Sequence, residues 1–141
     1  MALNEHQRRR LEVSLGLLDR TLLEVERNYL SADLPRGEMF ELTSDLTPEE
    51  ESRIRATITQ IRHRLRRLRE AFHLEPHRRD VRSLLRGYFS HFWAALSDCR
   101  TSTLRGYGEV APQLKQTLDP EIEALLVLIE RLERIVERRR E

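Results

Sequence analysis

The sequence predicts an all-α fold, namely an antiparallel four-helix bundle with a short extra helical turn before the last helix. Three observations support this prediction. Glycine and proline number only five each and charged residues make up 35% of the 141 residues, a composition typical of long amphipathic helices. Apolar residues recur at alternating spacings of four and three, as in helices packed lengthwise. Helix start signals precede these apolar runs.

The first helix is expected at about residues 4–30. Asn4 and Gln7 have the spacing of a capping box, in which each side chain satisfies the backbone N–H of the other residue. Pro35 and Gly37 then mark a loop. The apolar seam of this helix consists of Leu11, Leu15, Leu18, Leu22, Val25 and Tyr29.

The second helix is expected at about residues 48–73. Thr47 is the predicted cap, Pro48 suits the first helical position, and Glu50 completes a second capping box. Pro76 ends the helical segment, because proline disfavours helical geometry in the residue before it. The seam repeats that of the first helix, with Ile54, Ile58, Ile61, Leu65, Leu68 and Phe72.

The third and last helices are expected at about residues 79–104 and 120–139. Asp119 is the predicted cap of the last helix, with Pro120 at its first position. A short helical turn is expected within 110–118. All four helices are assigned to one domain, residues 1–141. The third seam is Val81, Leu85, Tyr88, Phe92 and then Leu96, or Ala95 and Cys99; the last is Ile122, Leu125, Ile129, Leu132 and Val136.

Charges beside the first two seams predict how these helices pair. Three acids spaced seven apart flank the first seam, and three arginines spaced seven apart flank the second at the same heptad position. Such positions face each other only in an antiparallel pair. The predicted pairs are Glu12–Arg69, Asp19–Arg62 and Glu26–Arg55.

Four arginines of the second helix are not explained by this pairing, and they are candidates for anion binding. They are Arg53, Arg64, Arg66 and Arg67. Nucleic-acid sites usually add stacking aromatics or a groove-entering motif. Here the aromatics occupy seam positions of the third helix, so nucleic acid is the secondary expectation, behind a solvated face or the acidic surface of a partner protein.

The third and last helices have apolar surfaces wider than packing on one neighbour requires. A surface of this width often buries against another chain. Self-association is therefore expected, although a larger core covered by residues 31–46 or 110–118 is the alternative. The predicted interface residues are Tyr88, Phe89, Trp93, Leu126 and Leu128.

The stretch RGYFSH at 86–91 contains an arginine and a histidine with four residues between them. This spacing resembles the ribonuclease motif of the all-helical HEPN domains. The resemblance covers six residues and implies RNA cleavage by Arg86 and His91 at a dimer seam. Gly87 stands where a polar residue commonly follows the arginine. His73 is preceded by Arg66 and Arg67 at similar spacing, so the pattern is not distinctive.

No metal site or cofactor is expected. Cys99 is the single cysteine, which excludes an internal disulfide and a four-thiolate zinc site. Glu70 and His73 form half of a di-iron motif without a second such pair. The longest dense apolar run, at 124–129, is far shorter than a membrane span, and no signal peptide is recognisable. A soluble, cytoplasmic protein is expected.

The sequence therefore favours a non-enzymatic helical interaction module. We expect a self-associating subunit or an adaptor of a larger complex, with a homo-oligomer, another protein, or both as partners. The alternative is a small helical nucleic-acid-binding or HEPN-like ribonuclease subunit that uses the basic second helix together with Arg86 and His91.

Overall fold

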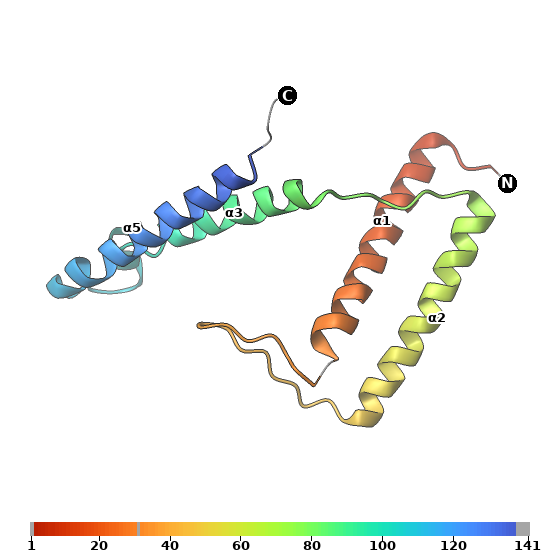
Figure 1. Cartoon of the computed structure of the whole chain (residues 1–141), viewed down its shortest axis with the longest axis horizontal. Helices are drawn as coiled ribbons and strands as arrows, with labels where there is room; N and C mark the ends of the chain where they lie inside the picture. The colour runs from red at the N-terminus through yellow and green to blue at the C-terminus, as the bar shows by residue number, and fades with distance from the viewer. Residues whose placement is uncertain (1, 31, 138–141) are drawn as a thin grey trace. The chain divides into compact units, whose positions relative to one another are not determined.

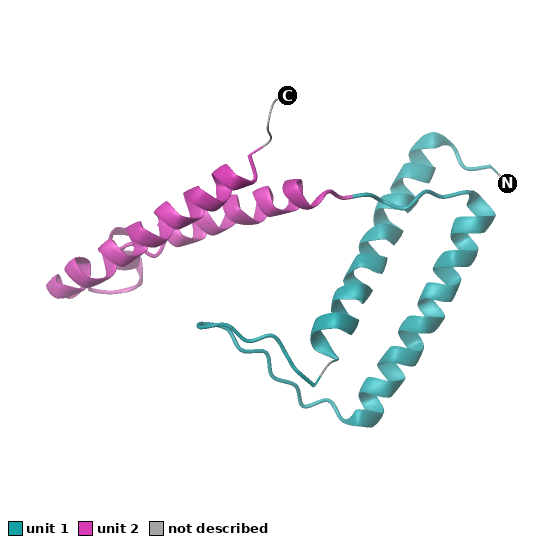
Figure 2. Cartoon of the chain, viewed as in Figure 1, with its two compact units in different colours: residues 1–78 teal, residues 79–141 magenta. Residues whose placement is uncertain are grey.

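The computed structural model describes residues 2–30 and 32–137, and it confirms the all-α class. Within these residues, extended structure is limited to one isolated bridge between Arg36 and Glu41. The chain divides into two compact units, Met1–Arg78 and Arg79–Glu141 (Figure 2). Each unit contains an antiparallel pair of long helices (Figure 1). The structure thus shows two helical hairpins, and the arrangement of all four helices as one bundle in a single domain stays a prediction.

Unit 1 consists of α1 (Glu5–Glu24), the π-helix η1 (Val25–Tyr29) that continues it, a loop, and α2 (Pro48–Phe72). Both predicted capping boxes are confirmed. The Asn4 side chain accepts from the Gln7 N–H at 2.8 Å, and Gln7 accepts from the Asn4 N–H at 3.0 Å. Thr47 and Glu50 exchange the same bonds at 3.1 and 3.0 Å. The starts of both helices are therefore set by four local residues.

The antiparallel pairing of α1 with α2 is also confirmed, but only one of the three predicted ion pairs forms. Arg62 lies 3.8 Å from the Asp19 carboxylate and also pairs with Glu26. Arg55 instead donates to the Leu30 carbonyl at 2.7 Å, and Glu12 accepts from the Glu75 N–H at 2.5 Å. The segments that follow the helix ends expose backbone groups without helical partners. These groups bind Arg55 and Glu12 in place of the predicted charged partners.

Two further contacts tie the end of α2 and the segment after it to α1. Arg8 donates to the carbonyls of Phe72 and His73, at 3.3 and 2.9 Å, where α2 ends with His73 in the left-handed region at φ 54°. Gly16 lies so close to His77 that a Cβ at position 16 would be 2.6 Å from the His77 Cβ. Glycine is therefore required where residues 74–78 cross α1.

Unit 2 consists of α3 (Val81–Ser97), the single turn α4 (Thr101–Leu104), the 3-10 turn η2 (Arg105–Tyr107) and α5 (Pro112–Ile135). The predicted boundaries are wrong at two places. The third helix stops at Ser97 rather than 104, and the last helix begins at Pro112 rather than 120. The expected separate turn at 110–118 is thus largely the beginning of α5, and Pro120 lies inside that helix.

Asp119 explains both differences. It does not cap a helix but accepts from the Thr101 N–H at 3.0 Å and from the Thr101 hydroxyl at 2.8 Å. Thr101 is 2% exposed, so these bonds are shielded by packing. The Thr101 N–H is the group that would otherwise continue the hydrogen-bond ladder of α3, and its capture by Asp119 favours a new helical turn.

Side-chain contacts at several levels hold α3 against α5. Arg82 donates to the carbonyls of Ile135 and Glu137, both at 3.3 Å. Near the middle, the Trp93 indole N–H donates to Glu130 at 3.2 Å. The apolar core of the unit is small and consists mainly of Ile122, Leu126 and Val136.

None of the helices in the described part of the chain combines the length and the apolar character needed to cross a bilayer.

Candidate functional site

A second apolar stripe runs along α5 beside the face that packs on α3. Leu125, Leu128, Leu132 and Ile135 repeat at spacings of 3-4-3, and their exposed fractions are 43, 47, 39 and 66%. The core residues Ile122 and Leu126 of the same helix are at most 7% exposed. Helix α5 therefore carries two adjacent apolar faces, of which only one is covered within the hairpin.

Helix α3 carries a matching exposed stripe. Val81, Tyr88 and Phe92 are 69, 48 and 44% exposed, and the rings of Tyr88 and Phe92 stack at 6.4 Å. Phe89 and Trp93, one position further along the chain, are half-buried against α5. Val81, Tyr88 and Phe92, three residues of the predicted third seam, are therefore exposed. Phe89 and Trp93, predicted to bind another chain, make the internal contact.

Both stripes lie on the same side of the hairpin. On each helix an exposed apolar residue is followed directly by one that packs inward, as with Phe92 and Trp93 or Leu125 and Leu126. Each stripe is thus displaced from the packing face in the same rotational sense. Because α3 and α5 run antiparallel, equal displacement brings both stripes to one surface. We call this surface the apolar face; it comprises Val81, Tyr88, Phe92, Leu125, Leu128, Leu132 and Ile135.

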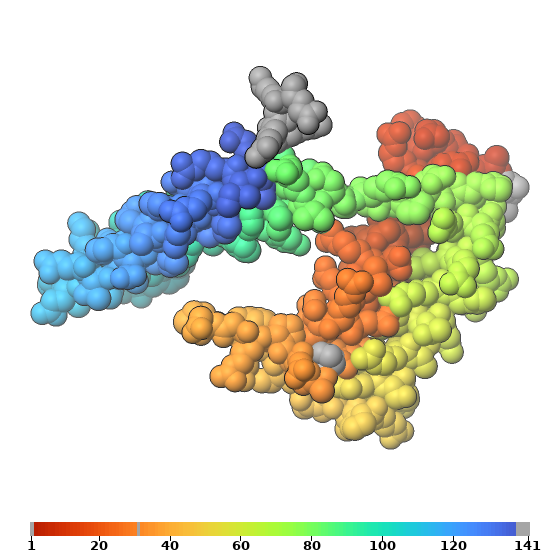
Figure 3. All heavy atoms as spheres, in the orientation of Figure 1, coloured from red at the N-terminus to blue at the C-terminus, as the bar shows by residue number. Residues whose placement is uncertain are grey.

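The opposite side of the hairpin is polar and internally paired. Arg100 lies 2.7 Å from the Glu123 carboxylate, and Trp93 donates to Glu130. Val127, 51% exposed, is an isolated apolar residue on this side, since it precedes Leu128 by about 100° around α5. The hairpin of α3 and α5 is therefore amphipathic across its width. Figure 3 shows the atoms of α5, in blue, lying along those of α3, in green.

The predicted interface residues separate into three groups. Tyr88 and Leu128 lie on the apolar face with about half of each side chain exposed. Phe89 and Trp93 are half-buried between the helices. Leu126 is 2% exposed and belongs to the core of the hairpin. The 3-4 spacing revealed the apolar residues, but the sequence did not show which of them α5 and α3 cover for each other.

The four candidate anion-binding arginines are all exposed on α2, but they do not converge on one patch. At about 100° per residue, Arg53 and Arg64 lie within about 20° of each other around the helix, whereas Arg66 lies about 160° from Arg64. Arg67 lies between them on the outer side. Their arrangement along a single helix supplies no pocket for a polyanion, and nucleic-acid binding stays a prediction.

Arg86 and His91 are both exposed on α3. Five residues of helix separate their directions by about 140°, so their side chains leave different sides of the helix. Neighbours of Arg86 include Asp80, whose carboxylate caps α3 by accepting from the Ser83 N–H at 3.1 Å. Within one chain these two residues do not form a site, and their ribonuclease role stays a prediction that would need a second copy.

Two carboxylates of unit 2 have lowered pKa values. Hydrogen bonds from Thr101, first from its backbone N–H and then from its hydroxyl, hold the pKa of Asp119 below its ordinary value. Bonds from the hydroxyl and N–H of Ser83 lower the pKa of Asp80. Both groups therefore favour the ionised form and serve as fixed structural acceptors rather than as acids.

In the described residues, no three side chains of histidine, cysteine, aspartate or glutamate gather in a way that could hold a metal ion. Comparison of the chain with protein-family models, with curated proteins and with solved structures gave no match. The apolar face is consequently the feature on which a functional hypothesis rests.

Proposed function

We propose that the protein is a non-enzymatic helical interaction module that binds a second copy of itself through the apolar face of the α3/α5 hairpin. The single observation that supports this most strongly is the concentration of seven exposed, uncharged side chains on one side of two adjacent helices. A module of this kind has no substrate, and its activity is the assembly that it forms.

The size of the apolar face suits such an interface. With roughly 200 Å² for a fully exposed large side chain, the exposed fractions amount to on the order of 700 Å². Apolar patches on monomers reach about 300–600 Å², whereas a stable interface buries about 800 Å² on each partner. The apolar face, with the polar residues at its rim, reaches this size.

The total accessible surface supports the same conclusion. The chain exposes 12146 Å². Two separate compact domains of half its mass each would together expose about 9200 Å². The excess remains even when no contact between the units is assumed, so the two units together leave surface uncovered that typical compact domains would bury.

A second copy is the occupant that this geometry favours. The seven side chains of the apolar face are uncharged, so two copies can bring them together without placing like charges in contact, while the exposed Glu121 lies on the same side of α5 at one end of the face. Two hairpins joined by a two-fold axis would form an antiparallel four-helix core. We thus propose that the predicted bundle is completed between chains, with a cytoplasmic location that keeps the exposed Cys99 thiol reduced.

Light scattering on the full-length chain tests this proposal. Leu128→Glu places a charge in the centre of the apolar face and is expected to weaken self-association by roughly 30- to 900-fold, because central apolar contacts contribute about 2–4 kcal/mol. Val127→Glu is the matched control, since it adds the same charge to the polar side of the same helix.

The outcomes are distinct. A dimeric wild type and Val127→Glu variant with a monomeric Leu128→Glu variant would support the proposal. A monomeric wild type would contradict it, as would a dimer that Leu128→Glu leaves intact. Circular dichroism of each variant shows that the helices remain folded.

A further inference from the structure

The loop between η1 and α2 ends in an exposed apolar tip. An isolated bridge joins Arg36 to Glu41, the Gly37 N–H donates to the Phe40 carbonyl at 2.7 Å, and the Leu42 N–H donates to the Pro35 carbonyl at 3.2 Å. These bonds close a tight turn at residues 35–42. Figure 1 shows the turn extending away from the adjoining ends of α1 and α2.

The turn presents Met39 and Phe40 to solvent, with 96 and 60% of each residue exposed. Methionine adapts to irregular apolar surfaces, and aromatic residues are frequent anchors of interfaces. Glu38, Glu41 and Asp45 surround them on the loop, against one basic residue, Arg36. The tip therefore has the chemistry of a short acidic peptide with a two-residue apolar anchor.

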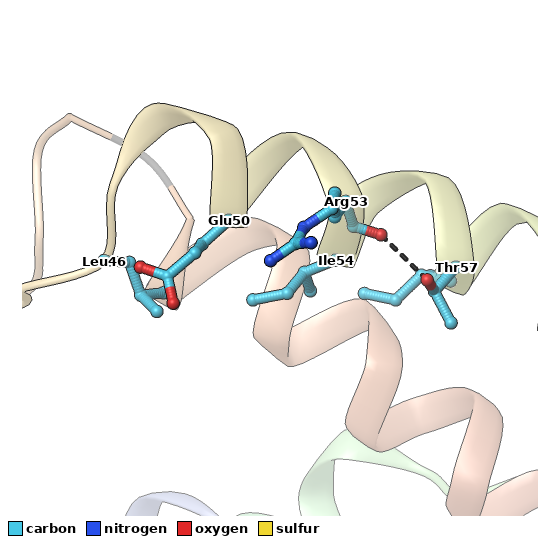
Figure 4. Close-up of a pocket in the computed structure, with 6 residues that line it drawn as sticks. Leu46, Glu50, Arg53, Ile54 and Thr57 are labelled. Atoms are coloured by element: carbon cyan, nitrogen blue, oxygen red, sulfur yellow. Dashed lines mark hydrogen bonds between the residues drawn. The ribbon is translucent and has the colours of Figure 1, made fainter.

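A pocket of complementary chemistry lies at the beginning of α2. Its volume is about 340 Å³, and it is lined by Leu46, Glu50, Arg53, Ile54, Thr57 and Ile58 (Figure 4). Three aliphatic side chains form its apolar part, among them Ile58 at 3% exposure. This volume is at the lower limit for small-molecule sites and suits one or two protein side chains.

The charged groups at the pocket are Glu50, which already takes part in a capping bond, and Arg53. Glu50 accepts from the Thr47 N–H in the capping box, and the Thr57 hydroxyl donates to the Arg53 carbonyl at 2.8 Å. Among the described residues, the exposed Arg53 guanidinium forms no ion pair. An occupant with an apolar side chain beside a carboxylate would match both parts of the pocket.

We propose that the Met39–Phe40 tip of one chain docks into the α2 pocket of a second copy, with Glu41 paired to Arg53. Each chain carries both this tip and this pocket, so a two-fold arrangement satisfies both at once. The tip extends away from the α2 start in its own chain, which favours exchange between copies. This contact lies wholly in unit 1 and does not rest on the apolar face of α3 and α5.

Photo-crosslinking between isotopically distinct chains tests the contact. Benzoylphenylalanine is incorporated at position 39 of an unlabelled full-length chain, which is mixed with a ¹⁵N-labelled wild-type chain, irradiated and digested. The expected product joins the unlabelled loop peptide to the labelled peptide that contains residues 46–58. Crosslinks only within the unlabelled chain, crosslinks to other segments, or none would overturn the inference.

A charge exchange tests the predicted pair. Arg53→Glu and Glu41→Arg are each expected to lower the crosslink yield roughly tenfold, and the double variant is expected to restore it. Arg64→Glu is the matched control, because Arg64 lies on the same side of α2 as Arg53 but about three turns from it and outside the pocket. Loss that the double variant does not restore would overturn the pairing.

The same experiment in the Leu128→Glu background separates this inference from the proposed function. Persistence of the crosslink at high protein concentration would support the tip contact whether or not the apolar face of α3 and α5 forms a dimer. A wild type that dimerises without this crosslink would overturn the tip contact alone.

Discussion

The two hairpins of this protein are held together by different means. Along the α1/α2 edge, unit 1 relies on charged side chains that reach backbone groups or each other, such as Arg55 to the Leu30 carbonyl and Arg62 to Asp19. Unit 2 packs a small apolar core that includes Leu126 and Ile122, and adds polar contacts at its margins. The exposed apolar residues differ as well, because those on α3 and α5, apart from Val127, gather on one side.

This difference indicates where partners bind. The ion pairs along the α1/α2 edge define the pairing of unit 1 but add little stability, since each exposed ion pair contributes only about 0.2–1 kcal/mol. The buried Leu30, Ile58 and Leu74 supply its apolar contacts. A hairpin with two apolar faces uses one for its own packing and leaves the other available to a partner. Unit 2 is thus suited to association through its helices, whereas unit 1 offers an isolated tip and a small pocket.

Loss of the Leu126 side chain is expected to have the largest effect on folding. Leu126→Ala removes a core side chain that is 2% exposed and should destabilise unit 2 by about 2–5 kcal/mol. Leu128→Ala, two residues further on, should lower the stability of the monomer by less than about 1 kcal/mol while weakening self-association. Urea unfolding followed by the fluorescence of Trp93, the single tryptophan, reports on unit 2. Equal effects of the two variants on the monomer would contradict the distinction between the faces.

Alanine substitutions at two glycines, Gly16 in unit 1 and Gly87 in unit 2, are expected to change the stability of the two units in opposite directions. Gly16→Ala should destabilise unit 1 by about 1–3 kcal/mol, because the new Cβ would be 2.6 Å from the His77 Cβ. Gly87→Ala on α3 meets nothing within 4 Å and should stabilise unit 2 by about 0.5–1 kcal/mol. Circular dichroism should show the first change with the Trp93 transition unaltered. A Gly16→Ala variant as stable as wild type would place residues 74–78 elsewhere.

The ion pairs of unit 1 should have a smaller effect. Arg62→Ala removes contacts to Asp19 and Glu26 and should cost about 1 kcal/mol, with the loss reduced by added salt. Arg64→Ala is the control and should be neutral, because the exposed Arg64 forms no ion pair among the described residues. Equal losses for both variants would show that the charged edge does not hold α1 to α2.

The smallest expected effect concerns Asp119 and the acid unfolding of unit 2. The lowered pKa of Asp119 means that its bonds to Thr101 contribute stability above its unfolded pKa, about 3.9, and lose it as pH falls through the folded value. Asp119→Asn should therefore weaken unit 2 at neutral pH and reduce the dependence of its stability on pH in this range. Trp93 fluorescence during acid titration measures this, and an unchanged acid transition would contradict it.

Local signals predicted the beginnings of α1 and α2 because a capping box involves only residues three apart. The beginning of α5 was not predictable in this way. Asp119–Pro120 and Ala111–Pro112 both offer proline at a first helical position, and the contact of Asp119 with Thr101 across the hairpin decides between them. Local sequence does not contain that contact.

The charge pattern and the apolar pattern were informative to different degrees. Arg62, in the middle of α2, pairs as the heptad pattern predicts, whereas Arg55 and Glu12 bind backbone groups that no side-chain pattern reveals. Likewise, spacing identified Tyr88 and Phe92 as apolar positions, but only the rotation of α3 against α5 shows that they face outward. The Met39–Phe40 tip was missed because two apolar residues in a loop have no periodicity.

The most direct test of the central claim is to observe what contacts the apolar face. In an equimolar mixture of ¹³C-labelled and unlabelled full-length chains, isotope-filtered NOE spectra report only contacts between copies. We predict NOEs from the Leu128 and Leu132 methyl groups of one copy to the Tyr88 and Phe92 rings of another. Spectra without such cross-peaks, while the same methyl groups show contacts only within their own chain, would contradict self-association through this face.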